Sequence, residues 1–148
     1  DGMDDIEFMI STNAGEGFSP LSKTASGGEL SRIMLAIKNV TAQKDGIDTL
    51  IFDEVDSGIS GKTSRKIGVK LKEISEYSQV LCITHSAQIA SLANTHFLVS
   101  KHVENDRTET CVNLLNDEQR IEETARILSG INITESARKT ARELIFNT

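Results

Sequence analysis

The chain has 148 residues, of which 38% are hydrophobic and 26% charged, proportions that are ordinary for one globular domain. It carries 16 lysines and arginines against 22 aspartates and glutamates, and because the basic residues are scattered, the chain alone is unsuited to nucleic-acid binding. No apolar run approaches the ~20 residues of a membrane span, no charged-then-apolar stretch resembles a signal peptide, and there is no CxxC pair and no zinc-like histidine spacing. We therefore expect an intracellular protein without a disulfide framework or a structural zinc.

The N-terminal part of the chain predicts a strand, a loop and a long helix. Ile6, Phe8 and Ile10 alternate with other residues, as in a strand with one well-buried face. Glycine and proline between positions 13 and 20 predict a loop. A helix then begins near Gly28, because apolar residues recur at helical spacing from there to Val40.

Ser26, Gly27 and Gly28 stand at the predicted start of this helix. The first turn of a helix exposes unpaired N–H groups, glycine lets a ligand approach the backbone, and a serine hydroxyl adds a donor. The three residues are therefore a candidate anion-binding site. In the alternative interpretation, Ser26 is an ordinary N-cap residue and the glycines form a plain turn.

The most informative stretch begins with the apolar run Thr49–Phe52, which predicts a strand buried on both faces, as in a parallel sheet flanked by helices. Asp53 and Glu54 follow it directly, and a loop of small residues continues to Gly61. Ligands of open α/β sheets bind beyond the carboxyl ends of the strands, so the two acids are candidates for chemistry. Alternatively, they are solvated turn formers.

A second strand repeats this arrangement. Residues 62–77 predict an amphipathic helix, and the apolar run 80–83 predicts another core strand. Thr84 and His85 follow that run, which places His85 at the same sheet edge as the two acids. A histidine at a strand end is often structural, but the neighbouring acids make this one a candidate for chemistry.

The remainder of the chain predicts a short helix at 87–93, a strand hairpin formed by 96–100 and 108–115, and two closing helices. The first closing helix ends at Ser129-Gly130, and the second starts at a cap residue, Thr134. The sequence shows no internal repeat and no low-complexity segment.

Two other catalytic motifs are disfavoured. Gly61-Lys62-Thr63 follows a strand and opens a helix, but a phosphate-binding P-loop, G-x-x-x-x-G-K-[ST], needs glycine where this chain has Asp56. An aspartate there would repel the phosphates that the loop binds. Ser60 lies in G-I-S-G and not in the G-x-S-x-G elbow of hydrolases, which disfavours a serine nucleophile.

Taken together, these residues are more specific than any one of them. In order and spacing, four stretches resemble the C-terminal half of an ABC-type ATPase head: ASGGELSR at 25–32, TLIFDEVD at 49–56, SGIS at 57–60 and TH at 84–85. Within that superfamily, ASGGELSR, DEVDSGISG and THSAQIA resemble the RecN family of bacterial SMC-like proteins of DNA double-strand break repair. The resemblance covers essentially the whole chain.

The resemblance implies a role for each candidate residue. Asp53 corresponds to the Walker B aspartate that supports Mg²⁺ through water, Glu54 to the residue that polarises the attacking water, and His85 to the switch histidine that senses the γ-phosphate. The signature motif, which contacts the γ-phosphate of a nucleotide held by the opposite head, falls on Ser26, Gly27, Gly28 and Glu29. The D-loop falls on Ser57, Gly58, Ile59 and Ser60. ABC proteins commonly have aspartate in place of Ser60, so the contacts of that aspartate are not carried over.

The implied fold is the C-terminal lobe of an ABC-type (P-loop NTPase) α/β head over residues 1–148, with a mainly parallel sheet flanked by helices, a strand hairpin and two C-terminal helices. The implied protein is cytoplasmic and nucleoid-associated, and it binds and hydrolyses ATP with Mg²⁺ in DNA repair and recombination. The expected partners are the N-terminal Walker A lobe of the same protein, joined through a coiled coil, a second head in a homodimer, and DNA through the full-length protein, with no membrane partner.

The isolated chain should be catalytically incomplete, because it contains no Walker A loop. Two alternatives stay open. One is the head of another SMC-like or ABC ATPase, for example in chromosome organisation. The other is a regulatory module that kept the fold and lost hydrolysis.

Overall fold

The computed structural model describes residues 2–11, 15, 17–24, 26–104 and 107–147. Ala25 of the ASGGELSR motif and parts of the predicted loops, at 12–14, 16 and 105–106, lie outside the described residues. In chain order, the elements are β1 (Met9–Ile10), β2 (Ser19–Pro20), α1 (Leu21–Thr24), α2 (Gly27–Asp45), β3 (Thr49–Phe52), α3 (Lys62–Ile74), β4 (Gln79–Cys82), α4 (Ala87–Ala90), β5 (Phe97–Glu104), β6 (Arg107–Leu114), α5 (Asp117–Ser129) and α6 (Glu135–Phe146).

The described strands form three two-stranded sheets. β3 and β4 pair in parallel, with Leu50 opposite Val80 and Phe52 opposite Cys82. The pairs β1–β2 and β5–β6 are antiparallel. The chain is therefore a mixed α/β fold in which the two predicted core strands lie side by side and the predicted hairpin is confirmed.

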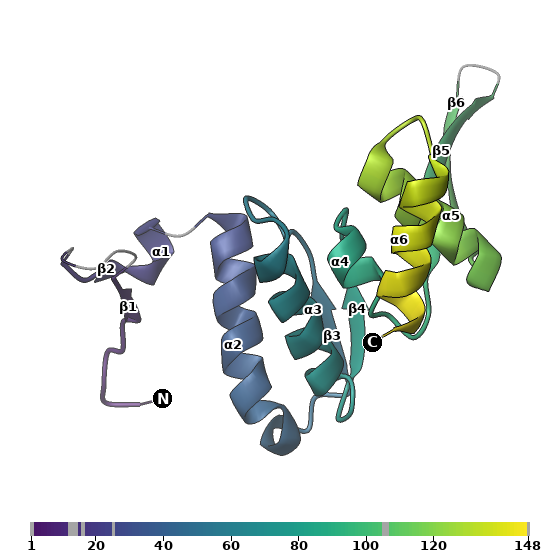
Figure 1. Ribbon diagram of the computed structural model, residues 1–148. Coiled ribbons are helices and arrows are strands. Elements are labelled where there is room, and N and C mark those ends of the chain that lie inside the picture. Colours follow the sequence, from purple (N-terminus) through teal and green to yellow (C-terminus); the bar gives the residue numbers. More distant parts are fainter. Residues whose placement is uncertain (1, 12–14, 16, 25, 105–106, 148) are drawn as a thin grey trace.

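Helices cover one face of the parallel pair. In Figure 1, α2 and α3 lie side by side against β3 and β4, whereas α5 and α6 pack together beside the hairpin. The larger core lies between α2, α3 and the parallel pair, and it consists of Leu35, Ala42, Phe52, Val55, Ile67, Leu71, Ile74 and Ile89. A smaller core joins α5 to α6 and consists of Ile121, Ala125, Ala137, Ala141 and Ile145.

The helix ends follow from local capping. Ser26 and Glu29 form a capping box at the start of α2, and Gly46 ends that helix in the left-handed conformation, with φ of 60°. A second capping box involves Asn116 at the start of α5, and the Thr134 side chain caps α6 as the sequence predicts. The helix predicted at 62–77 ends earlier, at Ile74, because the residues that follow form turns.

The prediction that the core strands are buried on both faces is wrong for this chain. Leu50, Val80 and Cys82 pack against the larger core. On the opposite face, Ile51 is 67% exposed and Leu81 is 43% exposed. Ile83, just beyond β4, is 61% exposed. The apolar run predicted two buried faces, but the described residues cover only one.

The predicted N-terminal strand is also shorter than expected. It is limited to Met9–Ile10, because its pairing partner is only Ser19–Pro20. Ile6 and Phe8, which were expected on a well-buried face, are 77% and 70% exposed. Alternation alone could not bury these side chains, since within the described residues no larger sheet receives the strand.

Candidate functional site

The carboxyl end of β3 carries two adjacent exposed acids. The Glu54 N–H donates to Asp53 Oδ1 at 2.9 Å, and the Ser57 N–H closes a turn by donating to the Glu54 carbonyl at 3.0 Å. Among the described residues, Glu54 is the one non-glycine residue with a positive φ, 57°. A left-handed conformation is costly for a residue with a Cβ, and such strain tends to occur at functional sites.

The start of α2 lies directly against this turn. A Cβ added at Gly27 would lie 2.8 Å from Glu54 Oε2. A Cβ added at Gly28 would lie 2.9 Å from Ser57 Cβ and 3.0 Å from the Glu54 carbonyl oxygen. Glycine at both positions therefore permits the close approach of the helix start to the acidic turn.

Ser26 acts as the N-cap residue of α2. Its Oγ accepts the Glu29 N–H at 3.4 Å, and the Ser26 N–H donates to Glu29 Oε2 at 2.9 Å. The N-cap interpretation of Ser26 is therefore confirmed. The glycines, however, form no plain turn, since they are the first residues of α2.

Two side chains of α2 hold the acidic turn from its other side. Ser31 Oγ donates to the Asp53 carbonyl at 2.7 Å. Arg32 Nη1 donates to the Ser57 carbonyl at 2.8 Å and, more weakly, to the Val55 carbonyl at 3.4 Å. The turn is thus connected to α2 through its backbone carbonyls.

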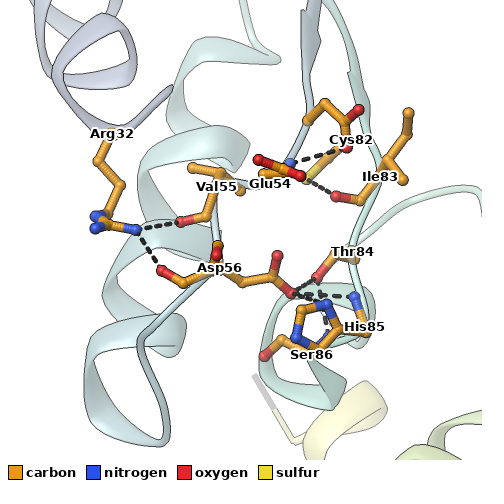
Figure 2. Close-up of polar contacts among 11 residues, drawn as sticks. Arg32, Glu54, Val55, Asp56, Cys82, Ile83, Thr84, His85 and Ser86 are labelled. Atoms are coloured by element: carbon orange, nitrogen blue, oxygen red, sulfur yellow. Dashed lines mark hydrogen bonds and ion pairs between the residues drawn. The ribbon is translucent and has the colours of Figure 1, made fainter. Parts of the chain in front are cut away.

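A buried carboxylate links the ends of β3 and β4. Asp56 is only 2% exposed, and its Oδ2 accepts the Thr84 hydroxyl at 2.5 Å and the His85 N–H at 3.0 Å. The same oxygen lies 3.5 Å from His85 Nδ1. Figure 2 shows Asp56 between Arg32, which reaches the flanking carbonyls, and the segment from Thr84 to Ser86. The His85 side chain itself is 83% exposed.

The predicted D-loop residues complete the turn and lead into α3. Gly58 has φ of 72°, a conformation that glycine adopts without strain. Ile59 packs against the larger core, while Ser57 and Ser60 are exposed. The segment is therefore anchored by one apolar side chain and displays small polar groups.

Most of the predicted site residues lie at one edge of the molecule, around the acidic turn. Arg32, Asp56 and Thr84 lie within the stretches 25–32, 49–56 and 84–85, but the sequence pattern predicted no role in the site for any of them. The sequence signal for the burial of Asp56 was its apolar neighbour Val55, because a fully exposed turn does not need an apolar residue between its acids. In the structure Val55 is fully buried.

Cys82 adds an electrostatic feature behind the site. Burial, reinforced by the negative charges of Asp56 and Asp53, raises the pKa of the Cys82 thiol to about 12. The thiol is therefore protonated at neutral pH and is no nucleophile. Both Cys82 and Cys111 are free and half-buried.

The described residues contain no group of three or more His, Cys, Asp and Glu side chains that could hold a metal ion. Within the described ranges, no helix is long and apolar enough to cross a membrane.

Comparison with known proteins gives one consistent similarity. The chain is 48% identical to the DNA repair protein RecN of Halalkalibacterium halodurans over 97% of its length, and 48% and 47% identical to RecN of Vibrio cholerae and Treponema pallidum over the same share. It spans about a quarter of the length of these curated relatives. No protein-family profile matches the chain.

The fold has a counterpart among solved structures. A structure from a study of ATP-driven dimerization and DNA-stimulated activation of SMC ATPases matches 80% of this chain and 71% of its own, with a TM-score of 0.53 and 18% sequence identity. At that identity, the likeness shows a shared fold. Along nearly its whole length, the chain therefore matches one part of the RecN family of DNA repair proteins.

Proposed function

We propose that the chain is the C-terminal lobe of the head of an SMC-like ATPase, and that the full-length protein hydrolyses ATP in DNA double-strand break repair and recombination. The similarity to RecN and the SMC ATPase fold support this proposal. One observation carries it: the glycine pair at the start of α2 lies against the turn that displays Asp53 and Glu54.

The exposed acids fit a magnesium nucleotide. Mg²⁺ usually binds one or two protein carboxylates and completes its shell with waters and substrate phosphates, so Asp53 is sufficient to hold it through water. When bound, Mg²⁺ neutralises the charge that develops on the transferred phosphoryl group. The exposed Glu54 carboxylate would accept a proton from the attacking water, and its left-handed backbone keeps it beside Gly27.

The geometry of the site supports the remaining proposed roles. His85 displays its ring to solvent at the same edge and can donate to a phosphate oxygen. Ser26 to Glu29 stand at the start of α2, and Ser57 to Ser60 follow the acids. A two-fold homodimer of heads would present both segments to nucleotide, since an isologous interface uses the same patch twice.

The uncovered apolar faces support a missing N-terminal lobe. The parallel pair has an exposed apolar face, and the separate hairpin has one of its own, where five residues are each more than half exposed: Phe97, Val99, Val103, Val112 and Leu114. Apolar patches of this kind usually mark a binding surface. Because the chain spans about a quarter of its relatives' length, we assign these faces to the Walker A lobe of the same protein.

The charge balance assigns DNA contact to other parts of the protein. The chain carries a formal charge of −6, and phosphate binding requires concentrated basic residues. We therefore propose that DNA binds through the full-length protein, in the cytoplasm at the nucleoid, and that ATP hydrolysis in the head controls this engagement.

The substitution Glu54→Gln in the full-length protein tests the catalytic assignment. We expect ATP turnover to fall by about 100-fold or more, the usual loss when a general base is removed, while Mg²⁺-ATP binding persists. The matched control is Glu76→Gln, which alters an exposed acid beyond the far end of α3 and should leave turnover unchanged. Unchanged turnover in Glu54→Gln would refute hydrolysis at this site.

A further inference from the structure

Asp56 differs from the two acids before it. Asp53 and Glu54 are exposed, whereas Asp56 is 2% exposed. A carboxylate is costly to bury unless hydrogen bonds satisfy it. Asp56 meets this requirement by accepting the Thr84 hydroxyl and the His85 N–H, both from the segment that follows β4.

These bonds fix the segment that carries His85. The His85 N–H donates to Asp56 Oδ2, and the Ser86 N–H donates to Thr84 Oγ1 at 3.0 Å. Asp56 Oδ2 also faces His85 Nδ1 at 3.5 Å. The backbone of His85 is therefore held by Asp56, and Nδ1 of its ring lies near the same carboxylate while the side chain stays exposed.

The other side of the turn is fixed to α2. Arg32 donates to the carbonyls of Val55 and Ser57, the two residues that flank Asp56 (Figure 2). A displacement of α2 would therefore move the peptide groups on both sides of Asp56. Through Asp56, it would also move the segment at 84–86.

We propose that Asp56 is a positioning residue that fixes His85 relative to Glu54, and that Arg32 connects this unit to α2. The start of α2, the acidic turn and His85 then move as one body. The proposal deepens the proposed function and rests on it only for the consequence in catalysis, because the positioning itself is measurable without nucleotide.

The positioning is tested by hydrogen exchange of the full-length protein without nucleotide, followed on peptides that span 83–88. Asp56→Ala removes the acceptor, so exchange at the amides of 85 and 86 should accelerate about tenfold. Asp56→Asn keeps a carbonyl oxygen of the same shape, so it should retain most of the protection. If Asp56→Ala fails to fold, Thr84→Val takes its place, because it removes one donor to Asp56 and the acceptor of the Ser86 N–H.

Ser78→Ala is the matched control. The Ser78 side chain is buried and donates to the Ile47 carbonyl at 2.7 Å, before β4 and away from the site. Ser78→Ala therefore loses one buried hydrogen bond outside the site, and exchange at 83–88 should stay at the wild-type rate. Exchange that is unchanged in Asp56→Ala and Thr84→Val, or equally fast in Ser78→Ala, would overturn the positioning role.

Steady-state kinetics separate this inference from the proposed function. We expect Asp56→Ala to lower kcat about tenfold with little change in KM for ATP, and Asp56→Asn to recover most of the loss. If Glu54→Gln retains turnover while the exchange result holds, the proposed function fails and the positioning role stands. If Glu54→Gln abolishes turnover and the Asp56 variants keep wild-type kcat, the catalytic consequence of the positioning is wrong.

Discussion

Gly27 at the start of α2 lies against the carboxylate of Glu54, because a Cβ added at Gly27 would lie only 2.8 Å from Glu54 Oε2. The two residues are separated by most of α2 and all of β3 in the sequence, yet the fold leaves no space for a methyl group between them. The position of the Glu54 carboxylate therefore depends on glycine at position 27.

Substitution of the two glycines should separate activity from stability. Gly27→Ala meets only the end of the flexible Glu54 side chain, so stability should change by less than about 1 kcal/mol, while ATP turnover of the full-length protein falls as Glu54 moves. Gly28→Ala meets Ser57 Cβ and the Glu54 carbonyl, and overpacking of this kind costs about 1–3 kcal/mol. Thermal unfolding and turnover assays measure both effects. Equal stability losses in the two variants would contradict the packing described.

The left-handed backbone of Glu54 predicts a conflict between stability and activity. Glu54→Gly removes the steric cost of φ at 57°, so the free energy of unfolding should rise by about 1 kcal/mol while turnover is lost. The control is Asp53→Gly at the neighbouring exposed acid, which has no positive φ and should lose stability through chain entropy and through loss of the hydrogen bond from the Glu54 N–H. Denaturant titration of both variants measures their free energies of unfolding. A destabilised Glu54→Gly would show that the turn is not strained.

The raised pKa of Cys82 predicts slow alkylation of its thiol and a loss of protein stability at high pH. A folded-state pKa of about 12, above the ordinary 9.0, means that the unfolded chain releases this proton first. The contribution of the protonated Cys82 thiol to stability is therefore complete below pH 9 and is lost as pH rises from about 9 toward 12.

At pH 8, iodoacetamide should modify Cys82 at least about 100-fold more slowly in the folded chain than in the denatured chain. The alkaline loss of stability should be smaller in Cys82→Ala, and equal alkylation rates would refute the shifted pKa.

The exposed face of β3 predicts a difference between the isolated chain and the longer protein. Ile51 is 67% exposed here, so Ile51→Thr should change the stability of the isolated chain by less than about 0.5 kcal/mol. If the Walker A lobe covers this face, the same substitution should cost the full-length protein about 1–3 kcal/mol. Val69→Thr on α3, 41% exposed, is the isosteric control and should be neutral in both chains. A neutral Ile51→Thr in the full-length protein would exclude burial of this face.

The sequence predicted the elements that local pattern determines. The strand at Thr49–Phe52, the hairpin and the cap at Thr134 follow from apolar runs, alternation and cap chemistry. The apolar run at 49–52 predicted that Ile51 is buried, but Ile51 is 67% exposed. An apolar run indicates side chains suited to two covered faces, and the described residues cover only one face of this strand.

The contacts around Asp56 could not be predicted in the same way. An aspartate in a turn normally faces solvent, and its burial depends on a segment about 28 residues later in the chain, which donates from Thr84 and His85. The contact between Gly27 and Glu54 likewise depends on how α2 packs on the sheet. Local pattern indicated which residues to consider, while tertiary packing determined their partners.

A calorimetric titration with ATP and Mg²⁺ tests most directly whether this chain is half of a nucleotide site. It should be performed on the 148-residue chain alone and on the same chain combined with the N-terminal lobe of the full-length protein. We predict no appreciable binding by the chain alone and clear binding by the combined lobes, because in the proposed function the phosphate-binding loop belongs to the other lobe. Micromolar binding by the chain alone, abolished by Lys62→Met, would instead place the phosphates at Gly61-Lys62-Thr63 and contradict the account, as would an absence of binding by the combined lobes.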